Sequence, residues 1–158
     1  GVLDYLQFFY SPLTKELEFF GVDQRHESDI EGLGRIPSEQ QLKSKKVPSF
    51  NVIGNSPLVL RESLLDEVYK MGENFVEAAK RVVSPGMNGP FCIEGVYDEN
   101  AKFTSFEFSA RIVAGTNIYM DGSPYYSLLF NENMSMGKRI AREIKIAEEE
   151  KQIEKIVT

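Results

Sequence analysis

Glu94 and Glu107 are the two residues whose spacing most directly suggests shared chemistry. Residues 91–111 alternate between apolar and polar side chains, which is typical of strands that bury one face. A turn centred on residues 100–101 would join two such strands into a hairpin, in which residues whose numbers sum to 201 face each other. The facing pairs are then Glu94 with Glu107, Cys92 with Ser109, and Val96 with Ser105.

Two carboxylates placed in this way need a positive charge between them. Directly opposed side chains on antiparallel strands have Cβ atoms about 4.5–5.5 Å apart, and like charges there destabilise the pair. Magnesium would reconcile them, because it is typically held by one or two carboxylates while phosphates and water complete its octahedron. The alternative is a pair of solvated glutamates on an open sheet face, screened by salt and by neighbouring lysines.

The remaining side chains of this hairpin point to the opposite face, which we expect to be buried because it is apolar. That set consists of Phe91, Ile93, Tyr97, Phe106, Phe108 and Ala110.

The elements that must position these residues follow from the hydrophobic pattern of the chain. Residues 5–27 predict two antiparallel strands joined by a polar turn. Residues 30–48 predict a loop in which Ser38 caps a short helix through Lys45, and residues 50–53 predict a strand that ends at residues 54–57.

The second half of the chain predicts two long helices and two strands. Apolar residues at steps of three and four from Glu62 to Val82 predict an amphipathic helix closed by Ser84-Pro85-Gly86. Strands follow at residues 91–98 and 103–113, then a glycine-rich loop over residues 114–124. The last helix begins near Ser135 and places Met136, Ile140, Ile144 and Ala147 on one face. These elements predict one α+β domain, with the helices packed against one face of an antiparallel sheet.

Composition excludes several classes of protein. The chain has 158 residues, a net charge of -6 and a single cysteine. The acidic balance argues against a nucleic-acid binder, no apolar run is long enough to span a membrane, and one cysteine favours a reducing, cytoplasmic compartment. His26 lacks the partners of a catalytic triad, and we expect it to be hydrogen-bonded or on the surface, while Cys92 is expected to be a packing residue.

Several segments in fixed order resemble the archaeal-type formate-dependent FAICAR synthetase family (PurP), a family of ATP-grasp ligases. They are FFYSPL (8–13), GNSPLVLRESLL (54–65), PGMNGPFC (85–92), FSARIVAGTN (108–117) and MSMGKRIAREI (134–144). The resemblance spans essentially the whole chain. It implies that residues 1–158 form the C-terminal part of an ATP-grasp fold, and that an N-terminal domain and a nucleotide-clamping lobe precede Gly1.

The same resemblance implies a reaction and a set of site residues. The family joins formate to the amine of AICAR through formyl phosphate, giving FAICAR in purine (IMP) biosynthesis, with ATP and Mg2+, or Mn2+, as cofactors. By resemblance Glu94 and Glu107 hold the metal, Arg111 contacts the transferring phosphoryl group, Glu27 binds the nucleotide and Asn55 binds AICAR. Ser109 stands where the family has asparagine, which leaves a third metal ligand open. The loop residues Gly115, Thr116, Asn117 and Ser123 suit a ribonucleotide phosphate.

Alternatives remain beside this assignment. Glu27 could simply pair with Arg25, and Asn55 could be a turn residue before Ser56-Pro57. The chain could belong to a paralogous ligase that uses another acid or amine, or to a noncatalytic binding or assembly module. We expect the isolated chain to be inactive, and its aromatic first strand, if exposed, would suit a homo-oligomer interface.

Overall fold

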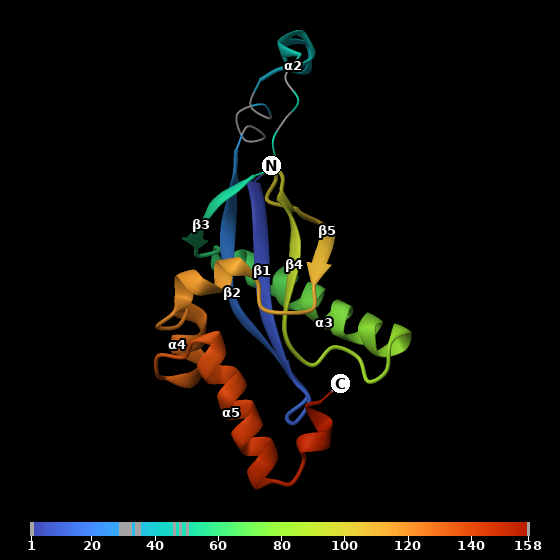
Figure 1. Cartoon of the computed structure of the whole chain (residues 1–158), viewed down its shortest axis with the longest axis vertical. Coiled ribbons are helices and arrows are strands. Elements are labelled where there is room, and N and C mark those ends of the chain that lie inside the picture. Colours follow the sequence, from blue (N-terminus) through green and yellow to red (C-terminus); the bar gives the residue numbers. More distant parts are fainter. Residues whose placement is uncertain are drawn as a thin grey trace.

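The computed structural model describes residues 2–28, 33, 36–45, 47, 49 and 51–157. Within this part of the chain, five antiparallel strands form one sheet in the order β3-β2-β1-β4-β5 (Figure 1). The strands are β1 (Val2–Ser11), β2 (Glu16–Glu27), β3 (Val52–Leu58), β4 (Gly89–Tyr97) and β5 (Phe103–Ser109). The helices are α2 (Ser38–Ser44), α3 (Leu65–Val82), α4 (Pro124–Phe130) and α5 (Met136–Glu149), with short 3-10 turns η1 (Glu62–Leu64), η2 (Ala114–Tyr119) and η3 (Ile153–Lys155).

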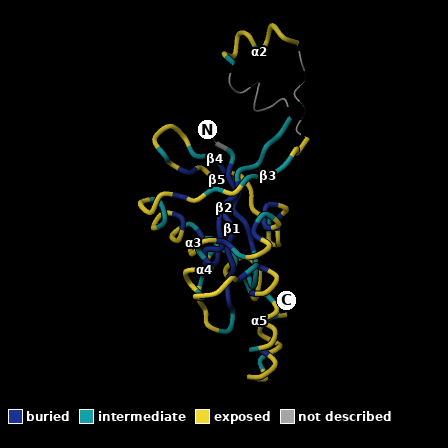
Figure 2. Tube along the Cα trace, turned by 90° about the vertical axis from the view of Figure 1, so that its left-hand side faces the viewer, coloured by how far each residue is buried: buried dark blue, intermediate teal, exposed yellow. Residues whose placement is uncertain are grey.

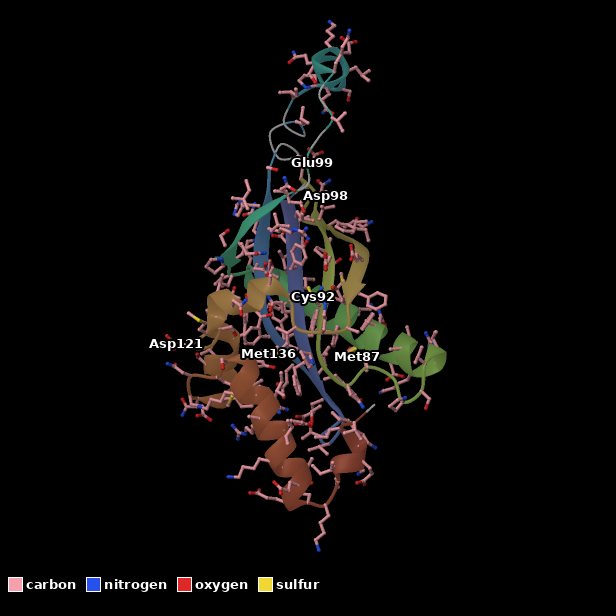
Figure 3. The ribbon with its side chains drawn as sticks, in the orientation of Figure 1. Met87, Cys92, Asp98, Glu99, Asp121 and Met136 are labelled. Atoms are coloured by element: carbon pink, nitrogen blue, oxygen red, sulfur yellow. The ribbon has the colours of Figure 1, made fainter. Side chains whose placement is uncertain are left out.

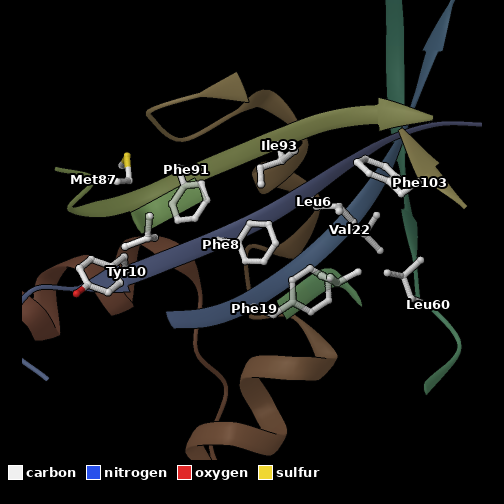
Figure 4. Close-up of a cluster of buried hydrophobic side chains, with 12 residues drawn as sticks. Leu6, Phe8, Tyr10, Phe19, Val22, Leu60, Met87, Phe91, Ile93 and Phe103 are labelled. Carbon is white, nitrogen blue, oxygen red and sulfur yellow. The ribbon is translucent and has the colours of Figure 1, made fainter. Parts of the chain in front are cut away.

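Helix α3 covers one face of the sheet, which we call the α3 face. Its core contains Phe8, Phe19 and Phe91 from three neighbouring strands and Val68 and Val76 from α3 (Figure 4). The rings of Phe8 and Phe91 stack with centroids 5.1 Å apart. Aromatic pairs of this kind stabilise a core beyond the apolar area that they bury.

The opposite face of the sheet carries a second hydrophobic core. Phe9 and Phe20 pack there against Tyr119, Tyr126 and Met136 from η2, α4 and α5. The expectation that both long helices pack on one face is therefore wrong. The reason is the side-chain period of two, because β1 and β2 are apolar on both faces and each face must be covered.

Charged side chains fasten α5 to this second core. Arg139 donates through Nε and Nη2 to Glu18 and through Nη1 to Glu143, and all three residues are buried. The helix begins where the sequence predicts, since the Ser135 hydroxyl accepts from the Lys138 backbone N–H at 3.2 Å. Its buried face includes Arg139 and Glu143, whereas the predicted apolar residue Ile144 is 49% exposed.

Most predicted elements are confirmed, with changes at their ends. The N-terminal hairpin and α3 form as expected, and α2 ends at Ser44 with Pro37, not Ser38, at its N-cap. Strand β3 continues through Leu58, beyond its predicted end, and Phe50 lies outside the described residues. Strand β5 stops at Ser109, short of its predicted end at Val113. Helix α4 begins at Pro124, where the predicted loop ends, and lies in a stretch for which no element was predicted.

The first strand lies in the middle of the sheet and is not an exposed edge. Phe8, Phe9 and Tyr10 are all buried, and the central strands appear as the dark core of the trace in Figure 2. The idea that this strand forms an oligomer interface is therefore wrong. Among the described residues, no helix is long and apolar enough to cross a membrane.

Candidate functional site

A row of polar side chains crosses the sheet on the face opposite α3. Tyr5 pairs with Asp23 on one side and with Glu94 on the other, and Glu94 pairs with Glu107. We call this surface the polar face, defined by Tyr5, Gln7, Asp23, Glu94 and Glu107. Because neighbouring strands lie about 4.8 Å apart, the row from Asp23 to Glu107 is about 14 Å long.

The register predicted for the two glutamates is confirmed. Glu94 faces Glu107 and Cys92 faces Ser109, but Val96 faces Thr104 instead of Ser105. The register shifts between Glu94 and Gly95 because β5 carries one extra residue there, a β-bulge.

Part of the face of the hairpin that was expected to be buried is open to solvent. Phe91 and Ile93 are buried on the α3 face, whereas Phe106 and Phe108 are 60% and 58% exposed and Ala110 is exposed too. The expectation of a fully buried face fails for these three because β5 is the edge strand, and of α3 only Phe75 makes a ring contact with Phe108.

The glutamate pair has the features that a hard divalent cation requires. Glu94 is buried and Glu107 is exposed, so the pair opens to solvent on one side. Ser109 Oγ donates to Glu94 Oε1 at 3.1 Å, which orients that carboxylate. Within the described part of the chain neither glutamate forms an ion pair, and no cluster of three or more metal-ligating side chains occurs. Two carboxylate groups therefore fit Mg2+ or Mn2+ whose other ligands come from phosphates and water.

Arg111 and Cys92 lie near this pair but differ in solvent exposure. Arg111 is exposed, and its Nη1 donates to the Ile112 carbonyl at 2.9 Å. Cys92 is fully buried near the middle of the sheet (Figure 3), and burial raises the pKa of its thiol. It is a packing residue, as the sequence predicts, whereas Arg111 remains accessible to a ligand.

Arg25 connects Glu27 to Tyr5, which neighbours Glu94 in the sheet. Its Nε lies 2.7 Å from Glu27 Oε1, and its Nη1 donates to the Tyr5 hydroxyl. Burial, together with the charge of the neighbouring Glu94, raises the pKa of Tyr5. The alternative that Glu27 pairs with Arg25 is thus realised, and the pair adjoins the polar face through the Tyr5 hydroxyl.

Asn55 lies within β3, so the alternative of a turn residue is wrong. It pairs with Arg25 across the sheet, and its Nδ2 donates to Asp23 Oδ2 at 2.6 Å. Asp23 also accepts from Gln7 Nε2, and both Asp23 and Gln7 are buried. Sequence reasoning missed these two residues. Gln7 is a polar side chain inside a strongly apolar strand, which is a signal that could have revealed it, whereas Asp23 stands where the apolar part of β2 gives way to polar residues.

The residues predicted as a glycine-rich loop, 114–124, differ in what their side chains contact. Thr116 donates its hydroxyl to Gln7 Oε1 at 2.6 Å and its backbone N–H to the Val113 carbonyl. Ser123 is fully buried and accepts from the Tyr126 backbone N–H as the N-cap of α4. The side chains of Thr116 and Ser123 therefore form their hydrogen bonds inside the protein. Gly115 lies directly over Asp23, and Asn117 is exposed.

The fold is that of part of an ATP-grasp protein, as its match to a solved structure shows. Over 100% of its length the chain matches the crystal structure of an IMP biosynthesis protein, PurP, from Thermococcus kodakaraensis, with a TM-score of 0.81 and 36% sequence identity, covering 50% of that chain. The chain belongs to the family described as a domain of unknown function, DUF1297, whose model matches residues 1–158.

Named relatives confirm the resemblance to the FAICAR synthetase family. The chain is 84% identical over 158 residues to a 5-formaminoimidazole-4-carboxamide-1-(beta)-D-ribofuranosyl 5'-monophosphate synthetase of Nitrosopumilus maritimus, covering 46% of it. Proteins of the same name from Cenarchaeum symbiosum and Pyrococcus horikoshii are 72% and 51% identical over the whole chain, which covers 46% and 47% of them. The chain thus spans about half the length of the curated relatives that it matches.

Proposed function

We propose that this chain supplies the metal end and part of the substrate site of an ATP-dependent ligase that makes FAICAR from AICAR and formate. It corresponds to the C-terminal part of the ligase, and its partners are small molecules. The observation that carries the proposal is the direct opposition of Glu94 and Glu107 on the polar face, in a chain 84% identical to a named synthetase.

The reaction has two balanced steps. A formate oxygen attacks the γ-phosphorus of ATP and ADP leaves, which gives formyl phosphate. The AICAR amine nitrogen then attacks the formyl carbon, phosphate leaves and the amine loses a proton. A divalent cation held by Glu94 and Glu107 neutralises charge on the phosphates when it is bound.

The residues of the chain have separate tasks in this proposal. Glu94 and Glu107 present carboxylate oxygens, and Ser109 orients one of them. The exposed guanidinium of Arg111 stabilises charge on the transferring phosphoryl group. Glu27 accepts from ribose hydroxyls and Asn55 contacts AICAR, while the exposed side chain of Asn117 is the group of η2 best placed for the ribonucleotide phosphate. Gly115, Thr116 and Ser123 support that segment from inside. The reaction belongs in the cytoplasm, and the enzyme is proposed to be a homo-oligomer.

A chimera provides the test. This chain would replace the matching segment of the N. maritimus relative, and FAICAR formation would be followed by chromatography with AICAR, formate and ATP. We expect FAICAR and ADP in equal amounts. ADP release with another acid or amine, and none with formate and AICAR, would instead identify a paralogous ligase, and no turnover with any pair would favour a noncatalytic module.

A further inference from the structure

Asp23 lies at the centre of a hydrogen-bonded chain on the polar face. Its side chain is fully buried, with Oδ1 accepting from Gln7 Nε2 at 2.5 Å and Oδ2 from Asn55 Nδ2 at 2.6 Å. Asp23 is the acceptor in both of these hydrogen bonds. Gln7 and Asn55 must therefore both turn their NH2 groups toward Asp23.

Gln7 is held from its other end as well. Its Oε1 accepts from the Thr116 hydroxyl at 2.6 Å, and Thr116 is itself tied by its backbone N–H to Val113. Oδ1 of Asp23 is thus committed to Gln7, which leaves Oδ2 for Asn55.

Gly115 closes the space over Asp23. A Cβ atom at Gly115 would lie 2.1–2.2 Å from the carboxylate atoms of Asp23, so only glycine allows the η2 backbone to approach this closely. The carboxylate is therefore sealed away from solvent and from any ligand. Whatever Asp23 contributes to binding must pass through Asn55, which is only half-buried.

We propose that Asp23 is a positioning residue that fixes the amide orientation of Asn55, so that Asn55 offers its carbonyl oxygen to an N–H group of the imidazole nucleotide. The proposal rests on the proposed function, which gives Asn55 its substrate. One N–H of Asn55 is used by Asp23, and Oδ1 lies on the opposite side of the planar amide. A ligand with an exocyclic amine or amide matches such an acceptor, whereas a ligand that offers only a carbonyl there leaves two acceptors facing each other.

The experiment is a double-mutant cycle in the chimera described above. Asp23→Asn keeps the size of the side chain but introduces an NH2 group. Because Thr116 holds Gln7 with its own NH2 group toward residue 23, the new NH2 group turns toward Asn55, and the orientation of Asn55 is lost. We expect Asp23→Asn to raise KM for AICAR about tenfold or more and to change KM for ATP less than about twofold. In an Asn55→Ala background, Asp23→Asn should change KM for AICAR by less than about twofold, because coupled residues are non-additive.

Two further variants separate positioning from loss of stability. Glu143→Gln neutralises another buried carboxylate, in the α5 network, and should leave both KM values unchanged even if it lowers Tm. Thr116→Val removes the hydroxyl that holds Gln7 and should raise KM for AICAR only in the presence of Asn55. If Asp23→Asn fails to fold, Thr116→Val takes its place in the double-mutant cycle.

The outcomes are distinguishable. An unchanged KM for AICAR in Asp23→Asn, or an effect of equal size with and without Asn55, overturns the positioning role. Absence of FAICAR from the unsubstituted chimera overturns the proposed function instead.

Discussion

Glu94 and Glu107 face each other across the β4–β5 pairing, yet one carboxylate is buried and the other is exposed. Ser109 holds the buried carboxylate by a hydrogen bond, so one carboxylate of the pair is fixed and the other is free to adjust. This asymmetry leads to a prediction for each glutamate.

Glu107→Gln in the chimera should lower kcat by about a hundredfold or more and raise the Mg2+ concentration needed for half-maximal rate, because a metal ligand loses its charge. Its effect on Tm should be small, since the side chain is exposed. Glu94→Gln should reduce activity as strongly but also change Tm. The matched control is Glu99→Gln in the exposed β4–β5 turn, and activity equal to that control would remove the metal-ligand assignment.

Asp4 predicts a specific pH dependence of stability. Its side chain is 1% exposed, neither carboxylate oxygen has a hydrogen-bond partner, and burial, aided by the Asp23 charge, raises its pKa from 3.8 to about 7. The unfolded chain releases this proton at lower pH than the folded chain does. The contribution of Asp4 to the free energy of unfolding is therefore undiminished below about pH 4, falls as the pH rises to about 7, and is lower by roughly 4 kcal/mol above that.

Asp4→Asn removes this titration and should flatten that fall. Melting temperatures of the chimera and its variant would be compared at intervals from pH 4 to 8, with Glu99→Gln as the control. We expect the Tm of Asp4→Asn to rise relative to the parent as the pH increases. Parallel curves would contradict the assignment of this group.

Arg139 should be the most costly arginine to remove from α5. Arg139→Met leaves Glu18 and Glu143 buried without their cation, and loss of one partner from a buried ionic network costs about 3–5 kcal/mol. Arg142→Met on the same helix is the control, because its pair with Glu132 is about half-exposed and contributes about 0–1 kcal/mol. Equal changes in Tm for the two variants would refute this ranking.

Two glycines should respond to alanine in opposite directions. Gly115→Ala drives a Cβ into the Asp23 carboxylate, so η2 must move away, and both Tm and affinity for AICAR should fall. Gly137→Ala lies in the first turn of α5, where no other atom lies within 4 Å of the place that the new methyl group would take, and it should raise stability by about 0.5–1 kcal/mol. A Gly115→Ala variant with unchanged Tm and KM would show that the contact is not tight.

The isolated 158-residue chain should not make FAICAR, since the nucleotide-clamping lobe that the family resemblance implies is not part of it. The same assay that detects product from the chimera checks this. Product from the isolated chain with formate and ATP would contradict it.

The candidate site could be predicted from the sequence where local patterns determine it. The alternation on both strands was enough to oppose Glu94 and Glu107, because register follows the buried face. It could not reveal the bulge at Phe106, which shifts the register directly beside that pair. Helix α4 was missed although Ser123-Pro124 is a recognised start signal, with a capping hydroxyl followed by proline.

Other features depend on contacts between distant parts of the chain. Asp23 is bound by Gln7, Asn55 and the η2 segment, and no periodicity links those positions. Which face of the sheet each helix covers likewise depends on contacts between distant segments. Family resemblance supplied residue roles, whereas the structure alone connects Asn55 to Asp23.

Phe8 and Phe9 are consecutive residues of β1 that belong to different cores, one under α3 and the other beside α5. Neither core can come apart without disturbing the strand that the other one needs. The two layers should therefore lose their structure together, and amide hydrogens of α3 and α5 should exchange with similar protection. In this fold cooperativity originates in the central strand, which both layers share.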